Sequence, residues 1–143
     1  MKTPTLAFIP LLLHLAKAYT GDMTYYDAGL GSCGYTSTNA DAIVALSTEI
    51  MNNGPNPNDN PICGSSINIY NPATGSTTAA TIVDTCQGCA EYDIDVSPSV
   101  FETVDPNGLS DGRIVVDWGG SKVGGKKRAV SRFGRRGGFN GTG

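Results

Sequence analysis

The sequence predicts a small all-β domain with short helices, folded as a closed or partly closed β-barrel. Three observations support this fold class. Strand-like segments rich in Thr, Ile and Val are short, and clusters of Gly, Pro, Asn and Asp separate them. Two helices are predicted, and both are brief. The segment with these features, residues 19–118, has a length typical of one domain.

Strands are predicted where β-branched and aromatic residues gather between turns. The glycine-rich residues 28–34 follow the first of these strands, and the turn at 71–75 joins the second and third in a hairpin. The predicted strands are residues 21–27, 67–70, 77–85 and 112–118.

Two short helices are predicted from their N-terminal residues. A short apolar segment at 43–46 leads to a helix that a hydroxyl side chain at position 47 or 48 could cap. Ser97 is a natural N-cap, and Pro98 suits the first helical position of a helix over residues 97–104.

Residues 1–18 are predicted to be a signal peptide. Lys2 precedes an apolar run over residues 6–15, and Ala16-Lys17-Ala18 follows as a small-residue cleavage site. The run is too short for a transmembrane helix. We therefore expect a secreted, extracellular protein beginning near Tyr19, with no membrane partner.

Loss of the leader would also remove His14, the only histidine. A His general base, a Ser-His or Cys-His nucleophile and a His metal site are then excluded. Acid–base chemistry is left mainly to carboxylates and tyrosines, and we expect neither a metal nor another cofactor.

The charge is unevenly distributed along the chain. All thirteen Asp and Glu residues lie between Asp22 and Asp117, where Arg113 is the only basic residue, so this span has a formal charge of −12. Such an acidic domain does not favour nucleic acid, whose phosphates need basic contacts. Residues 119–143 are rich in glycine and basic residues, and we expect them to form a disordered tail.

Four cysteines remain in the predicted mature chain, and in an oxidising compartment we expect two disulfides. Three pairings are possible, of which we favour Cys33–Cys63 and Cys86–Cys89. A four-cysteine zinc site is disfavoured because only one close Cys pair is present. A redox-active Cys-x-x-Cys remains an alternative that the acidic neighbourhood disfavours.

Carboxylates surround the Cys86–Cys89 loop. Asp84 ends the predicted strand, and Asp95 returns eleven residues later, just before the helix. Acids at the ends of elements can converge on one cleft, so both are candidate site residues. Asp84 could instead cap the loop through backbone N–H groups, and Asp95 could serve only the helix start.

Further candidates lie beside these two acids. We expect Asp95 to form a carboxylate cluster with Asp93 and Glu91, with Asp27 across the groove. Tyr25 and Tyr26 alternate on a strand, which predicts one core residue and one groove residue. Trp118, the only tryptophan, is expected in the core.

The motifs, in this order, resemble the fungal loosenins, which are single-domain relatives of expansins. They are Gly-x-x-Thr-Tyr-Tyr-Asp at 21–27, Gly-Ser-Cys-Gly at 31–34, Pro-Ile-Cys-Gly at 61–64, Val-Asp-Thr-Cys-x-x-Cys at 83–89 and Asp-x-Asp-x-Ser-Pro-x-x-Phe at 93–101. The resemblance implies a six-stranded double-psi β-barrel, the barwin-like architecture, with an open polysaccharide groove. It implies Thr24, Asp84 and Asp95 as groove residues, to which we add Tyr26.

The resemblance favours a monomeric protein that binds cell-wall polysaccharide of the cellulose or chitin class and loosens it without hydrolysis, and so is not an enzyme. An alternative is an inverting glycoside hydrolase or lytic transglycosylase. Related endoglucanases of glycoside hydrolase family 45 use two Asp, at positions resembling Asp27 and Asp95 here. A third possibility is a secreted barwin-like module that binds another protein, as an effector does.

Overall fold

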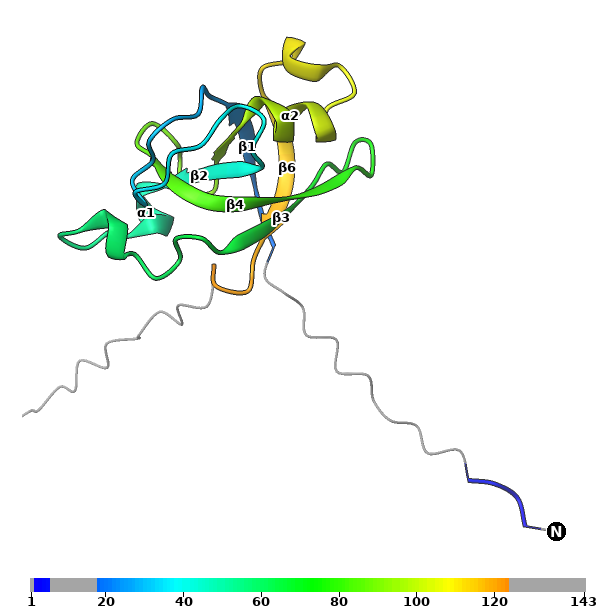
Figure 1. The fold of residues 1–143 in the computed structure, drawn as a ribbon. Helices are drawn as coiled ribbons and strands as arrows, with labels where there is room; N and C mark the ends of the chain where they lie inside the picture. Colours follow the sequence, from blue (N-terminus) through cyan, green and yellow to red (C-terminus); the bar gives the residue numbers. More distant parts are fainter. Residues whose placement is uncertain (1, 6–17, 124–143) are drawn as a thin grey trace, which may run out of the picture.

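The computed structural model describes residues 2–5 and 18–123, and its centre is a closed barrel of six strands (Figure 1). The order around the barrel is β1-β5-β2-β4-β3-β6. The strands are β1 (Tyr19–Tyr25), β2 (Ile43–Ser47), β3 (Ser66–Tyr70), β4 (Thr77–Cys86), β5 (Ile94–Val96) and β6 (Ile114–Gly119). The helices are short: α1 (Thr48–Met51), α2 (Pro98–Val104) and two 3₁₀ turns at Pro57–Asp59 and Gly108–Ser110.

The sheet is mixed. β1 pairs with β5 and β2 pairs with β4 in parallel, whereas the other four pairings are antiparallel. Closure pairs every strand on both sides, so the barrel has no open edge. The parallel pairs bring chain segments that are far apart in sequence to one side of the barrel.

Three predicted strands are found as β3, β4 and β6, and the first is found two residues earlier than predicted, as β1. Two strands were not predicted. All five residues of β2 are buried, so the segment lacks the alternation of a half-buried strand. β5 has only three residues, too few for a pattern to be recognised.

Both predicted helices are present, but their N-caps differ. The Ser47 hydroxyl accepts a hydrogen bond from the Ile50 N–H at 3.3 Å, as a capping side chain does. Ser97 occupies the N-cap position of α2, yet its hydroxyl donates to the Asp41 carbonyl at 2.5 Å. That bond ties the start of α2 to the segment before β2.

The core fills the barrel and extends beneath α2. Met23, Leu46 and Ile94 are fully buried from three different strands, and Phe101 joins them from α2. Trp118 is also in the core, as predicted, and its indole N–H donates to the Tyr92 carbonyl at 2.8 Å. Tyr25 packs against this core and meets the Phe101 ring edge-on.

The disulfides are Cys33–Cys63 and Cys86–Cys89, the pairing favoured from the sequence. The first joins positions 30 residues apart and fixes the glycine-rich loop beside β4. The second joins positions three residues apart at the end of β4.

The ordered chain continues past the predicted boundary at Trp118. Gly119 is the last residue of β6, and an isolated bridge then pairs Gly120 with Val123. Val123 is buried in the core cluster, so the start of the predicted tail is part of the domain. The rest of that tail, residues 124–143, and most of the predicted signal peptide lie outside the described residues.

Within the described ranges, no helix is both long and apolar enough to cross a membrane.

Candidate functional site: a polar groove across four strands

Four neighbouring strands place one residue each in a row across the outside of the barrel. Thr24 of β1 pairs with Asp95 of β5, Asp95 pairs with Ala45 of β2, and Ala45 pairs with Asp84 of β4. Directly paired residues point to the same face of a sheet. The neighbours of Ala45 along β2 are Val44 and Leu46, which belong to the core, so the row faces outward. We call Thr24, Asp95, Ala45 and Asp84 the groove row.

A register shift in β4 brings Asp84 into this row. Val44 pairs with Ile82, but Ala45 pairs with Asp84, so Val83 is passed over. Such an irregularity bends a strand and re-aims its side chains. With regular pairing, Val83 would stand beside Ala45 and Asp84 would fall outside the row.

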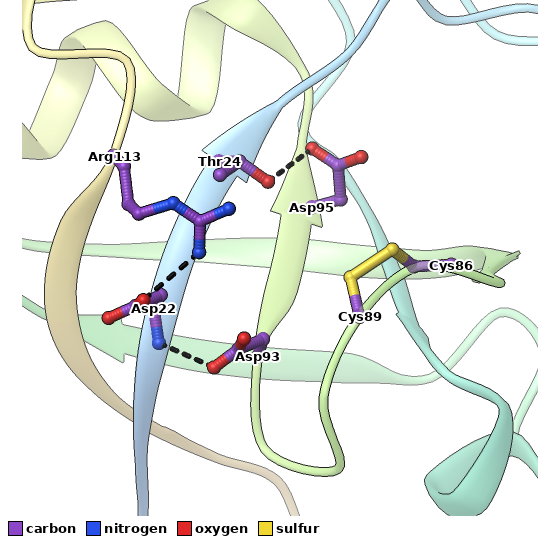
Figure 2. Close-up of polar contacts among 7 residues, drawn as sticks. All are labelled: Asp22, Thr24, Cys86, Cys89, Asp93, Asp95 and Arg113. Carbon is purple, nitrogen blue, oxygen red and sulfur yellow. Dashed lines mark hydrogen bonds and ion pairs between the residues drawn. A yellow bond between two sulfur atoms is a disulfide. The ribbon is translucent and has the colours of Figure 1, made fainter.

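Asp95 is half-buried in the row, and Thr24 supports it. The Thr24 hydroxyl donates to Asp95 Oδ1 at 3.0 Å (Figure 2). Burial raises the pKa of Asp95 above its usual value, and the Asp84 charge adds to this effect. The Thr24 hydrogen bond and the Arg113 charge lower the pKa without cancelling the rise.

Tyr26 follows β1 directly and lies near Asp84 and Asp95, whereas Tyr25 packs against the core. The Tyr26 backbone N–H donates to the Val96 carbonyl at 3.0 Å. Burial raises the pKa of Tyr26 far above its usual value, and the charges of Asp84 and Asp95 and a hydrogen bond with Asp84 raise it further. Tyr26 is therefore a neutral phenol that can donate a hydrogen bond at any physiological pH.

Asp84 holds the glycine-rich loop against the end of β4. Its Oδ1 atom accepts hydrogen bonds from the backbone N–H groups of Ser32 and Thr85, both at 2.8 Å. The loop approaches closely because Gly31 has no side chain: a Cβ there would lie 2.2 Å from the Val83 carbonyl oxygen. Asp84 therefore has both the turn-capping role considered from the sequence and a place in the groove row.

A hollow of about 430 Å³ opens beside Thr24 and Asp95. Its other walls are Asp93, Arg113 and the loop that carries Cys86 and Cys89. Figure 2 shows Asp95 on β5, Asp93 just before that strand, and the Cys86–Cys89 disulfide loop beside them.

Asp22 connects two of these walls. Its carboxylate accepts from Arg113 Nη1 at 3.0 Å, and its backbone N–H donates to Asp93 Oδ1 at 2.9 Å (Figure 2). The single cation of the acidic span therefore stands at the edge of the hollow.

The predicted carboxylate cluster is only partly assembled. Asp93 shares the hollow with Asp95, but Glu91 lines a different hollow together with Tyr19 and Glu49. Asp27 is exposed beyond the end of β1, and its Oδ1 atom accepts from the Asn39 side chain at 3.1 Å. The carboxyl whose charge raises the pKa of Asp95 is Asp84, across β2.

Sequence reasoning did not propose three residues of this region as site residues: Ser32, Ala45 and Arg113. Arg113 could have been found, because it is the only basic residue between Asp22 and Asp117. The places of Ser32 and Ala45 depend on long-range pairing that no local pattern reveals. Among the described residues, no group of three or more His, Cys, Asp and Glu side chains is placed to hold a metal ion.

The closed, mixed six-stranded barrel with short helices defines the class of this protein, the double-psi β-barrels. The profile of the Barwin family matches residues 51–121. The Streptomyces papain inhibitor has a solved structure that superposes with a TM-score of 0.64 at 32% identity, covering 72% of this chain and 93% of that one. The chain belongs to the barwin-like double-psi β-barrel proteins.

Two further proteins extend the comparison. An Allergen Asp f 7 homolog from the fungus Arthroderma benhamiae is 42% identical over 83 residues, which cover 57% of this chain and 27% of that protein. The chain thus spans less than a third of the length of the curated relatives it matches. A Clavibacter michiganensis expansin variant in complex with cellohexaose shares the fold, with a TM-score of 0.54 at 23% identity, covering 71% of this chain and 49% of that chain.

Proposed function

We propose that this chain is a secreted, monomeric protein that binds cell-wall polysaccharide of the cellulose or chitin class and loosens it without hydrolysis. The groove row carries the proposal, because it joins a hydroxyl and two carboxyls across four strands beside a hollow. An expansin of the same fold has been crystallised with cellohexaose, which supports a glycan ligand.

The chemistry of the groove suits sugar hydroxyls. Thr24 and Tyr26 donate their hydroxyl hydrogens to Asp95 and Asp84, so their oxygen atoms and the carboxyl oxygens are left to accept hydrogen bonds from sugar hydroxyls. Arg113 adds a charged donor at the edge of the hollow. Such a mixture of donors and acceptors on rigid strands orients a polyhydroxylated chain with little rearrangement.

The placement of the acids favours loosening over hydrolysis. Asp95, with its raised pKa, can hold a proton and donate it in a hydrogen bond to a glycosidic oxygen. Inverting hydrolysis also needs a second carboxylate that activates water. Neither Asp84 nor Asp27 lines the hollow to which Asp95 belongs, and Asp84 Oδ1 already accepts from two backbone N–H groups.

Secretion is supported by the predicted leader and by the two disulfides, which form in oxidising compartments. The acidic span supports the absence of a nucleic-acid partner. No cofactor enters the proposed mechanism.

The test is an Asp95→Asn variant of the mature protein, assayed on insoluble cellulose and chitin. We expect loosening of the fibres, followed as the loss of network strength, to fall roughly tenfold or more, because Asn cannot supply the acidic proton. Glu102→Gln on the exposed side of α2 is the matched control and should behave as the wild type. Neither form should release reducing ends.

Two results would overturn the proposal. Wild-type protein that stays in the supernatant with both polysaccharides would exclude the glycan ligand. Release of reducing ends by the wild type, abolished in both Asp95→Asn and Asp27→Asn, would establish a two-carboxylate hydrolase.

A second candidate is a protein-binding module that inhibits a cysteine protease. The observation in its favour is the papain inhibitor from Streptomyces, which this chain covers over 93% of its length. Papain activity in the presence of excess mature protein tests the idea. Full papain activity at every concentration of the mature protein would exclude it.

A further inference from the structure

The two disulfides of this protein differ in their access to solvent. Cys33 is 4% exposed and belongs to the core cluster, and Cys63, which is partly exposed, packs against that cluster, so one sulfur atom of this bond is buried. Cys86 and Cys89 are both partly exposed, and the two residues between them are exposed. A thiolate must reach a sulfur atom to cleave a disulfide, so the second bond, which offers both of its sulfur atoms, is the more accessible one.

The two bonds also close loops of very different length. Cys33 and Cys63 are 30 residues apart, whereas Cys86 and Cys89 are three apart. A disulfide stabilises the fold more when it closes a longer loop, because it then removes more entropy from the unfolded chain. Loss of the Cys86–Cys89 bond therefore weakens the whole fold less than loss of the other.

The chain on either side of this small loop is held independently. Cys86 is the last residue of β4 and pairs with Ser47 of β2. The Ser47 hydroxyl donates to the Glu91 carbonyl at 2.6 Å, and the Trp118 indole donates to the Tyr92 carbonyl at 2.8 Å. The barrel and the start of β5 do not depend on the disulfide.

The loop itself depends on the disulfide. Within the described chain, Gln87 and Gly88 make no hydrogen bond, and the Cys89 N–H to Cys86 carbonyl contact is long, at 3.4 Å. Gln87, Gly88 and Cys89 form one wall of the hollow beside Thr24 and Asp95. The covalent bond thus fixes a wall of the hollow and contributes less to the stability of the fold than Cys33–Cys63 does.

We infer that Cys86–Cys89 is a site of thiol–disulfide exchange and that its reduction loosens this wall of the groove. The co-reactant is a dithiol. One of its thiolates attacks a protein sulfur, forms a mixed disulfide and expels the other cysteine as a thiolate, which takes up a proton. The second thiol of the dithiol then displaces the first cysteine and forms a disulfide with its partner sulfur. Two electrons and two protons reach the protein, and the dithiol is oxidised.

The acidic surroundings define which reductants the site accepts. Asp93 and Asp95 line the same hollow as Cys89. Negative charge disfavours the approach of an anionic thiol and the departure of a thiolate. A neutral dithiol such as dithiothreitol should therefore react faster than glutathione, which carries a net negative charge, at equal concentrations of thiolate.

The site is tested without reference to glycan binding, by treating the oxidised mature protein with dithiothreitol and alkylating the thiols that appear. Peptide mass analysis should find Cys86 and Cys89 labelled about tenfold faster than Cys33 and Cys63. The Cys33–Cys63 disulfide, with one buried sulfur atom, serves as the control within the same molecule. Equal labelling of all four cysteines, or earlier labelling of Cys33 and Cys63, would overturn the exchange site.

The effect on the groove rests on the proposed function and needs a second measurement. After selective reduction and alkylation, binding to insoluble cellulose or chitin should weaken about threefold to tenfold, because the freed loop must be ordered again on binding. A Cys86→Ser/Cys89→Ser double variant should show the same weakening and should not respond to dithiothreitol. Selective labelling with unchanged binding would refute control of the groove. Oxidised protein that binds neither polysaccharide would instead contradict the proposed function and leave the labelling result standing.

Discussion

Burial and nearby negative charge raise the pKa of both Tyr26 and Asp95. Both effects favour the uncharged form of each group, and both groups lie in a strongly acidic domain. The Arg113 charge acts in the opposite direction and makes the rise in the pKa of Asp95 smaller. This combination suits binding of a neutral, hydroxyl-rich ligand better than binding of a cation.

The Tyr26 phenol should ionise at a higher pH than an ordinary tyrosine. Its pKa is raised by burial, by the charges of Asp84 and Asp95 and by the hydrogen bond with Asp84. An alkaline titration followed by phenolate absorbance should show a late phase, and Tyr26→Phe should reduce the amplitude of that phase. If Tyr26→Phe instead reduced the part of the titration that occurs at the ordinary pKa of tyrosine, the raised pKa of Tyr26 would be contradicted.

The raised pKa of Asp95 also predicts how stability depends on pH. In the window between the ordinary Asp pKa and the raised folded value, the folded state binds more protons than the unfolded state. The contribution of Asp95 to the free energy of unfolding therefore falls as pH rises through this window and is most favourable below it. Asp95→Asn removes this pH dependence. The free energy of unfolding of the variant minus that of the wild type should therefore be larger at pH 7 than at pH 3. Thermal unfolding of both proteins at both pH values measures this difference. The same difference in stability at pH 3 and at pH 7 would refute the prediction.

At the scale of elements, the site depends on the close approach of the glycine-rich loop to β4. Gly31→Ala would place a Cβ 2.2 Å from the Val83 carbonyl oxygen and 3.1 Å from the Asp84 Cβ atom. We expect a loss of about 1–3 kcal/mol in the free energy of unfolding, because backbone must shift. The Ser32–Asp84 hydrogen bond should weaken with it.

Gly29→Ala is the matched control for this prediction. A Cβ at Gly29 would meet no atom within 4 Å, so the change should alter stability by less than about 0.5 kcal/mol. Urea unfolding of the two variants makes the comparison. Equal effects of the two substitutions would mean that the loop relaxes freely and does not position Asp84.

Local patterns predict some of these elements and necessarily miss others. β3 alternates exposed and buried residues, so its sequence shows the period of a strand. β2 is buried throughout and β5 has three residues, so neither shows a period. Thr24, Asp84 and Asp95 could be chosen through the family resemblance. The register shift that aligns Asp84 with Ala45 could not, because it arises from pairing between segments distant in sequence.

At the scale of the whole molecule, the barrel is closed by β6 and by the short segment that follows it. Asn68 of β3 pairs with Gly119, so the last residue of β6 contributes to closure. Gly120 passes so near β3 that a Cβ there would lie 2.7 Å from the Ser66 carbonyl oxygen. The Val123 N–H then donates to the Gly120 carbonyl at 3.2 Å, and the Val123 side chain is only 5% exposed.

The extent of the folding unit can be tested with two shortened chains that both begin at Tyr19. A chain ending at Gly125 retains the buried Val123 and should unfold in urea with the same free energy as the full mature protein. A chain ending at Trp118 loses the Gly119 pairing and the burial of Val123, which should cost about 1–3 kcal/mol. Equal stability of the two shortened chains would show that Val123 contributes nothing. Lower stability of the Gly125 chain than of the full protein would show that the residues beyond it take part in the fold.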